Sequence, residues 1–160
     1  FRDSVNKGDK KGAVFLAAYR GKLSECLDFK DENARAVFCV GIPFPAVGDV
    51  KVRLKKEYNN SGYARKQAML SGGEWYTHQE FRAYNQALGR CVGHVHDYAA
   101  IFLVDARFAR HADAEKNKSM VSKWMRHLVS VFASPRESVG TLSEFFRRLE
   151  ADPPGRGAKE

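Results

Sequence analysis

The chain has 160 residues, of which 44% are hydrophobic and 12% aromatic, which is enough to build one packed core and argues against a disordered chain. Its 27 Lys and Arg residues exceed its 19 Asp and Glu residues, so a net charge of +8 favours a polyanionic partner, nucleic acid first, although such a charge also serves solubility alone. No apolar run approaches the roughly 18 residues of a membrane span, so we expect no membrane partner.

The first half of the chain predicts two buried strands and one helix. After a polar opening at residues 1–11, the apolar run at residues 13–19 is typical of a central parallel strand buried on both faces. A second such run occupies residues 36–42 and is ended by two prolines, which cannot donate to a sheet. Residues 49–59 predict an amphipathic helix, with lysines on one face. Its apolar stripe consists of Val50, Leu54 and Tyr58.

The second half predicts a long helix, a third strand and two further helices. Residues 74–91 predict a long helix, because apolar residues recur at the helical spacing i, i+4, i+7 and i+8 in Tyr84, Leu88, Cys91 and Val92. Residues 100–104 form another buried strand. The last two helices follow from apolar stripes, and the second begins with a capping sequence at Ser134. The stripes are Val121, Trp124, Leu128 and Val131 in the first, and Val139, Leu142, Phe146 and Leu149 in the second.

Strands alternating with helices predict a parallel α/β sheet with crossover helices. Three strands would leave edges and apolar surface exposed, so we expect further strands upstream of Phe1, which is not an initiator Met. The expected organisation is a linker or the end of a preceding element at residues 1–11, a partial lobe at residues 12–150 and a disordered tail at residues 151–160. Open α/β sheets bind ligands at a sheet edge, where the helix ending at Gly89 and Arg90 places polar groups.

Two segments resemble motifs of a known family. Residues 19–29, Tyr-Arg-Gly-Lys-Leu-Ser-Glu-Cys-Leu-Asp-Phe, and residues 86–90, Gln-Ala-Leu-Gly-Arg, resemble helicase motifs V and VI of the iron–sulfur DNA helicases related to xeroderma pigmentosum group D. The similarity covers roughly residues 12–150. Residues 122–126 and 142–145 resemble more narrowly the Fanconi anaemia group J helicase branch.

The resemblance implies the second lobe of an ATP-dependent 5′ to 3′ DNA helicase that acts in repair in the nucleus. Its fold would be an incomplete RecA-like (P-loop NTPase-type) sheet. No Gly-x-x-x-x-Gly-Lys-Ser/Thr occurs in the chain, so the P-loop is expected upstream in a first lobe, together with a 4Fe–4S cluster. ATP with Mg²⁺ would be shared between the lobes. The implied partners are single-stranded or forked DNA, the first lobe and repair proteins.

The resemblance also assigns nucleotide-binding residues. Arg90 would be catalytic, because its permanently charged fork matches phosphate oxygens, and Gly89 would allow close backbone approach. Gln86 would bond the nucleotide or the attacking water, and Asp28 would meet the ribose or its water network. Structural roles remain open for these residue types: a solvated helix-end arginine, a structural amide and a capping carboxylate.

By the same resemblance, Lys22 and Ser24 would contact the DNA backbone or couple it to the ATP site, since such groups bind phosphate without reading sequence. Trp75 and Tyr76 could stack on bases, or could pack in the core. A basic helix face could add DNA affinity, or could be merely solvated. It consists of Lys51, Arg53, Lys55 and Lys56.

Two departures from the family pattern bear on activity. The pattern continues Gly-Arg-x-x-Arg-His-x-x-Asp-Tyr-Gly, but Gly93 stands at the second arginine, and motif V has Cys26 where the family has glycine. An arginine finger contributes roughly 10³ to 10⁵ in rate, so the sequence predicts a slow ATPase unless Arg107 or another arginine takes that place. An alternative function is a degenerate, non-catalytic module that binds nucleic acid or a partner.

Cysteine chemistry provides no competing site. Cys26, Cys39 and Cys91 are odd in number and lack C-x-x-C spacing, which favours a reducing compartment over a disulfide framework. Cys91, His94 and His96 include zinc-type ligands, but their spacing offers no fourth ligand, so we expect no metal site.

Overall fold

A two-stranded parallel sheet lies at the centre of the protein. The computed structural model describes Val5, residues 12–22 and residues 29–154. Within these, β1 (Ala36–Val40) pairs with β2 (Ala100–Val104), Ala36 opposite Ala100 and Val40 opposite Val104. The chain crosses between them through helices, which confirms the predicted α/β class. The helices are α3 (Val50–Asn59), α4 (Gly62–Lys66) and α5 (Gly72–Leu88), and the 3-10 turn η2 (Gly89–Cys91) follows.

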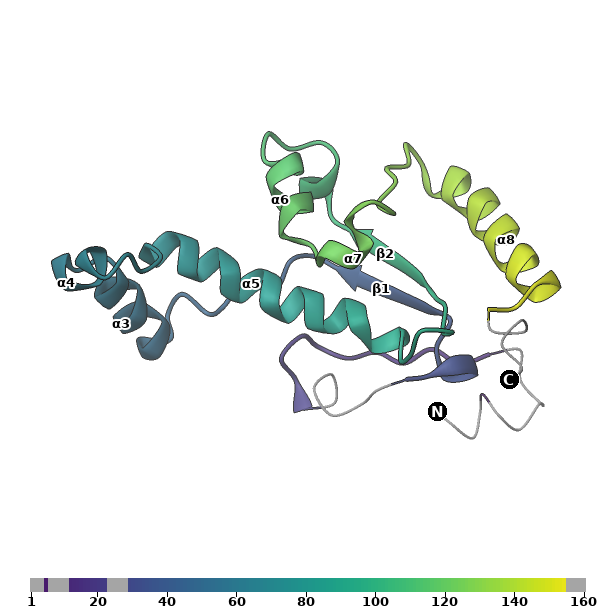
Figure 1. Ribbon diagram of the computed structural model, residues 1–160, viewed down its shortest axis with the longest axis horizontal. Coiled ribbons are helices and arrows are strands. Elements are labelled where there is room, and N and C mark those ends of the chain that lie inside the picture. The colour runs from purple at the N-terminus through teal and green to yellow at the C-terminus, as the bar shows by residue number, and fades with distance from the viewer. Residues whose placement is uncertain (1–4, 6–11, 23–28, 155–160) are drawn as a thin grey trace.

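The other elements flank this crossover. The turn η1 (Asp31–Asn33) precedes β1, and η3 (Ala106–Phe108) follows β2. Three helices complete the described chain: α6 (Ala114–Met120), α7 (Lys123–Arg126) and α8 (Pro135–Ala151). Figure 1 shows α3, α4 and the start of α5 projecting as an arm at one end, with α8 at the other. None of the described helices is sufficiently long and apolar to cross a membrane.

The core forms where α5 packs against one face of the sheet. The predicted stripe of α5 is confirmed, because Tyr84 and Leu88 are 0% exposed and Cys91 is 1% exposed. The helix begins two residues earlier than expected, where Ser71 and Glu74 form a reciprocal capping box. The remaining core members are Cys39, Ile42, Phe81, Phe108, Val121 and Met125.

The expected strand at residues 13–19 is wrong. Residues 12–18 form no strand, and Val14 and Leu16 are 85% and 86% exposed. No described strand pairs with this segment, and a strand without a backbone partner leaves its polar groups to water. The described residues cover only one face of the sheet, since Phe38 and Val40 of β1 stay exposed.

The helix at residues 49–59 is confirmed as α3, but its apolar stripe does not face the core. Val50, Leu54 and Tyr58 are all exposed, and Asn59 is the buried residue of α3. Polar contacts orient the helix: the Asn59 side chain donates to the carbonyl of Leu70, and Asn60 accepts from the amide of Gly72. The approach is so close that a Cβ at Gly72 would lie 2.5 Å from the carbonyl oxygen of Lys56.

The helix expected near residues 121–131 is confirmed only in part, because α7 is limited to Lys123–Arg126. The Asn85 side chain donates to the carbonyl of Met120 and accepts from the amide of Ser122. These two backbone groups therefore bond a side chain and not each other's neighbours in a continuous helix. Val121 and Met125 are buried, whereas the other predicted stripe members are exposed. These are Trp124, Leu128 and Val131.

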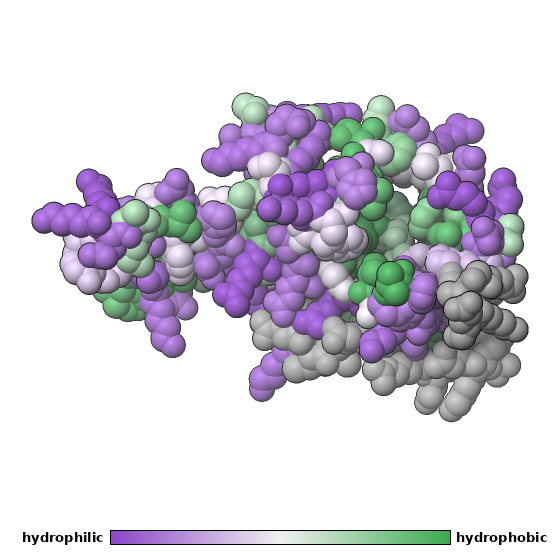
Figure 2. Space-filling view, in the orientation of Figure 1, coloured by the Kyte–Doolittle hydropathy of each residue, from purple (hydrophilic) through white to green (hydrophobic). Residues whose placement is uncertain are grey.

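The last helix is confirmed as α8, with Ser134 accepting from the amide of Glu137. Its apolar face is only half-buried, and Val139 is exposed. Figure 2 shows apolar side chains among charged ones both on the arm and beside α8. Within the expected tail, Ala151 is still helical, and residues 155–160 lie outside the described residues.

Candidate functional site

The candidate nucleotide-facing residues lie where α5 ends. Gln86 and Gly89 are exposed, and Arg90 is half-buried in η2. Gly89 has an ordinary φ of −77°, and a Cβ at this position would meet nothing within 4 Å. The local fold therefore does not require glycine at position 89, and the surface in front of its backbone is open.

Backbone and side-chain bonds bring the two motif-like segments together. The amide of Phe29 donates to the carbonyl of Arg90 over 3.1 Å, and the amide of Asp31 donates to Asp97 Oδ2 over 3.2 Å. His94 Nε2 lies 2.8 Å from Asp31 Oδ1. The chain that leaves the first motif is thus fixed against the chain that leaves α5.

The structure tests only part of the first motif. Ser24, Cys26 and Asp28 lie outside the described residues. Lys22 is exposed, in keeping with a surface contact. The bond between Phe29 and Arg90 places the residue after Asp28 beside the second motif.

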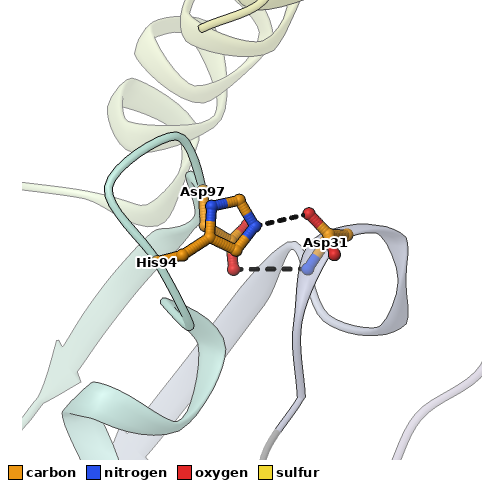
Figure 3. Close-up of side chains that lie close together, drawn as sticks. All are labelled: Asp31, His94 and Asp97. Atoms are coloured by element: carbon orange, nitrogen blue, oxygen red, sulfur yellow. Dashed lines mark hydrogen bonds and ion pairs between the residues drawn. The ribbon is translucent and has the colours of Figure 1, made fainter. Parts of the chain in front are cut away.

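Asp97 lies at the centre of the junction between the chain that leaves the first motif and the chain that leaves α5 (Figure 3). Its side chain is 0% exposed, and each oxygen accepts two hydrogen bonds. Oδ2 accepts from the amides of Gly93 and Asp31, and Oδ1 accepts from Arg35 Nη1 and the amide of Tyr98. Burial by itself would raise the pKa of Asp97, but these donors outweigh it and hold the pKa below its usual range.

Asp31, His94 and Asp97 also resemble a metal site, since one ligand-type atom of each lies within 4.8 Å of the others. Their bonding favours a different role. Both Asp97 oxygens are already satisfied, and His94 Nδ1 accepts from the amide of His96, which leaves the proton on Nε2 to donate to Asp31. We therefore interpret the group as a hydrogen-bonded junction that shapes the loop after α5.

Arg35 and Tyr98 extend the junction to α8. Arg35 donates to the carbonyl of Tyr98 over 3.0 Å, and its guanidinium lies 4.1 Å from the centre of the Tyr98 ring. The same ring contacts Phe145 and Phe146 of α8. Sequence reasoning missed Arg35 and Asp97 as organising residues, although Asp97 and Tyr98 match the Asp-Tyr of the family pattern.

Gly93 and Lys30 meet across the junction. A Cβ at Gly93 would lie 2.5 Å from Lys30 Cγ and 3.1 Å from its Cδ, so the lysine stem fills the space that a side chain at position 93 would enter. Arg107 is not available to replace the missing arginine. Its Nε and Nη2 bond both oxygens of Asp105, and its guanidinium lies 4.8 Å from the centre of the Phe44 ring.

The described cysteines do not fit an iron–sulfur cluster. Cys39 and Cys91 are 2% and 1% exposed, and burial raises the pKa of both thiols, that of Cys91 to about 11. A cluster needs thiolates, usually four of them. The upstream position of the cluster therefore stays a prediction.

The basic face of α3 is partly committed to the arm. The ammonium of Lys55 lies over the Tyr58 ring, that of Lys56 lies over the Tyr76 ring, and Arg53 pairs with Glu57. Tyr76 also donates its hydroxyl to the carbonyl of Pro45 over 2.7 Å. Tyr76 therefore has a structural role in the protein, whichever function the basic face has.

Comparison with known proteins gives the same family as the two motifs. Residues 1–128 match the helicase C-terminal domain family. The chain is 44% identical over 152 residues to the regulator of telomere elongation helicase 1 homolog of Aedes aegypti, covering 94% of the chain and 15% of that protein. It is 47% identical over 141 residues to the Fanconi anemia group J protein homolog of Gallus gallus, covering 86% of the chain and 11% of that protein. The chain thus spans only 15% and 11% of these two relatives.

Proposed function

Because the chain belongs to the helicase C-terminal domain family, among the iron–sulfur helicases related to xeroderma pigmentosum group D, we propose that it forms the second motor lobe of an ATP-dependent DNA helicase. This lobe would close on a first lobe that carries the P-loop and Mg²⁺-binding acidic residues. The full-length protein would unwind DNA with 5′ to 3′ polarity in the nucleus, in DNA repair. Its 4Fe–4S cluster would lie in the first lobe.

The bond between Phe29 and Arg90 is the observation that best supports this proposal. It joins the last residue of the segment resembling motif V to the segment resembling motif VI, which is the arrangement that a shared DNA- and nucleotide-binding surface would require. Lys22 and Ser24 would hold the DNA backbone, and Asp28 would bind the ribose. Beside the open backbone of Gly89, Arg90 and Gln86 would face the ATP phosphates and the attacking water.

The chemistry assigned to this lobe is electrostatic. Phosphoryl transfer requires positioned positive charge more than covalent participation by the protein, and a guanidinium stays charged at any physiological pH. Since the β- and γ-phosphates need a P-loop, which this chain does not contain, the isolated chain should not hydrolyse ATP.

A strand-displacement assay tests the proposal. We expect the full-length protein to unwind a duplex with a 5′ single-stranded tail when ATP and Mg²⁺ are present, and to leave unwound the matched duplex with a 3′ tail. A non-hydrolysable ATP analogue is the control for energy coupling. Unwinding from the 3′ tail would contradict the polarity.

The second candidate is the non-catalytic nucleic-acid- or partner-binding module. Gly93 favours it, because no side chain stands where the family has its second arginine. This candidate predicts salt-dependent binding to single-stranded DNA without strand displacement. A basic scaffold with no nucleic-acid role predicts neither binding to single-stranded DNA nor strand displacement.

A further inference from the structure

Lys30 occupies the space beside Gly93. Its Cβ, Cγ and Cδ would lie 3.3, 2.5 and 3.1 Å from a Cβ at Gly93, so its stem runs past the point from which a side chain at position 93 would start. Both residues are exposed. A lysine therefore lies where the chain after α5 lacks a side chain of its own.

The backbone around Lys30 is fixed by bonds on both sides. Phe29 donates to the carbonyl of Arg90, and Asp31 donates to Asp97. The carbonyl of Lys30 accepts from the amide and the side chain of Asn33. The start of the Lys30 side chain is therefore held relative to Arg90, which limits the entropy lost when its ammonium binds an anion.

Two other cations of the described chain are already committed. Arg35 bonds Asp97 and stacks on Tyr98, and Arg107 bonds Asp105. The ammonium of Lys30 makes no hydrogen bond or ion pair with any described residue. Lys30 can therefore serve a ligand beside Gly93, in addition to the role assigned to Arg90.

We propose that Lys30 is a phosphate-binding residue of the ATP site, and that it supplies, from the position directly after the first motif, the positive charge that Gly93 does not supply. This inference rests on the proposed function. During hydrolysis the oxygen of water bonds to the γ-phosphorus and gives up a proton to solvent, while the bond from that phosphorus to the β,γ-bridging oxygen breaks and ADP leaves with that oxygen. Lys30 keeps its proton and stabilises the negative charge on the phosphate oxygens. It binds as a point charge and lacks the guanidinium fork.

Substitutions at Lys30 in the full-length protein separate charge from packing. Lys30→Met keeps a long stem over Gly93 but removes the charge, and Lys30→Arg keeps the charge. We expect Lys30→Met to lower kcat for DNA-stimulated ATP hydrolysis by about 100-fold, as for loss of one preorganised donor. KM for ATP should change much less, because the contact strengthens in the transition state. Lys30→Arg should retain most activity, and Lys116→Met, on exposed α6, is the matched control.

A double substitution tests whether the two positions exchange roles. Gly93→Arg alone should not raise turnover, because its Cβ meets the Lys30 stem. The double variant Gly93→Arg/Lys30→Ala should hydrolyse ATP at least about 10-fold faster than Lys30→Ala alone. The arginine at position 93 then supplies the positive charge that Lys30 supplied.

The outcomes distinguish this inference from the function on which it rests. A Lys30→Met protein with the kcat of the unmodified protein would overturn the role of Lys30 and leave the helicase function intact. Failure of the double substitution to recover activity would also count against it. An unmodified full-length protein that neither hydrolyses nor binds ATP would overturn both.

Discussion

Substituting methionine for Arg90 in the full-length protein should lower kcat for ATP hydrolysis by at least about 10³-fold, which corresponds to about 4 kcal/mol of transition-state stabilisation. Methionine keeps an aliphatic stem but removes the charged fork that we assign to the phosphates. Arg90→Lys should restore only part of the activity, since a single ammonium cannot bond two oxygens in a fixed geometry. Steady-state turnover at saturating single-stranded DNA measures both.

The fold should survive this change, because the bond from Phe29 is accepted by the backbone carbonyl of Arg90. Arg82→Met is the control, since Arg82 is an exposed arginine two turns earlier on α5. DNA binding should be retained in both variants. An Arg90→Met protein whose kcat stays within about 10-fold of the unmodified protein would show that Arg90 is a solvated helix-end residue.

Asp97→Ala should open the junction. It removes the acceptor of four hydrogen bonds and leaves the Arg35 guanidinium without its carboxylate, a change that costs about 3–5 kcal/mol for a buried pair. We expect the amides of Asp31, Gly93 and Tyr98 to exchange about 10² to 10³ times faster with deuterium, measured on the full-length protein. ATP turnover should fall as well, because the loop beside Arg90 loses its shape.

The pH dependence provides an internal check on Asp97. Because its pKa is lowered in the folded state, its stabilisation is complete above about pH 4, the usual value of an unfolded aspartate, and is lost as pH falls through the lower folded pKa. Asp97→Asn removes this ionisation at nearly constant size. The difference in hydrogen-exchange protection between the unmodified protein and the Asp97→Asn variant should therefore shrink below about pH 4. Equal protection at pH 7 would contradict the role of Asp97.

Local signals were sufficient to predict the elements that carry the site. The stripe of Tyr84, Leu88 and Cys91 places one face of α5 in the core because periodic apolar burial fixes a helix's rotation. The runs that became β1 and β2 pair in parallel, as a helical crossover requires. Placing Arg90 at the end of α5 needed no long-range information.

The remaining features depend on contacts between residues distant in sequence. Periodicity placed Val50, Leu54 and Tyr58 toward a core, but the polar contacts of Asn59 and Asn60 with the loop before α5 turn this stripe to solvent. Hydrophobicity alone likewise cannot show that residues 13–19 pair with neither of the described strands.

The candidate site shows the same limit. Two of the four donors of Asp97 come from its own loop, and the other two, Asp31 and Arg35, lie 66 and 62 residues away in the chain, so no local pattern indicates their convergence. The place of Lys30 beside Gly93 is also visible only in three dimensions. Sequence comparison with the family pattern marked position 93 as a loss of charge, whereas the structure shows that the stem of a lysine from another segment fills the space a side chain at position 93 would enter.

ATP turnover by the purified full-length protein, measured with and without single-stranded DNA, tests the motor function most directly. We expect hydrolysis that rises when DNA is added, even though Gly93 replaces an arginine. Salt-sensitive DNA binding with no ATP turnover under any condition would contradict the motor function and leave a nucleic-acid-binding module.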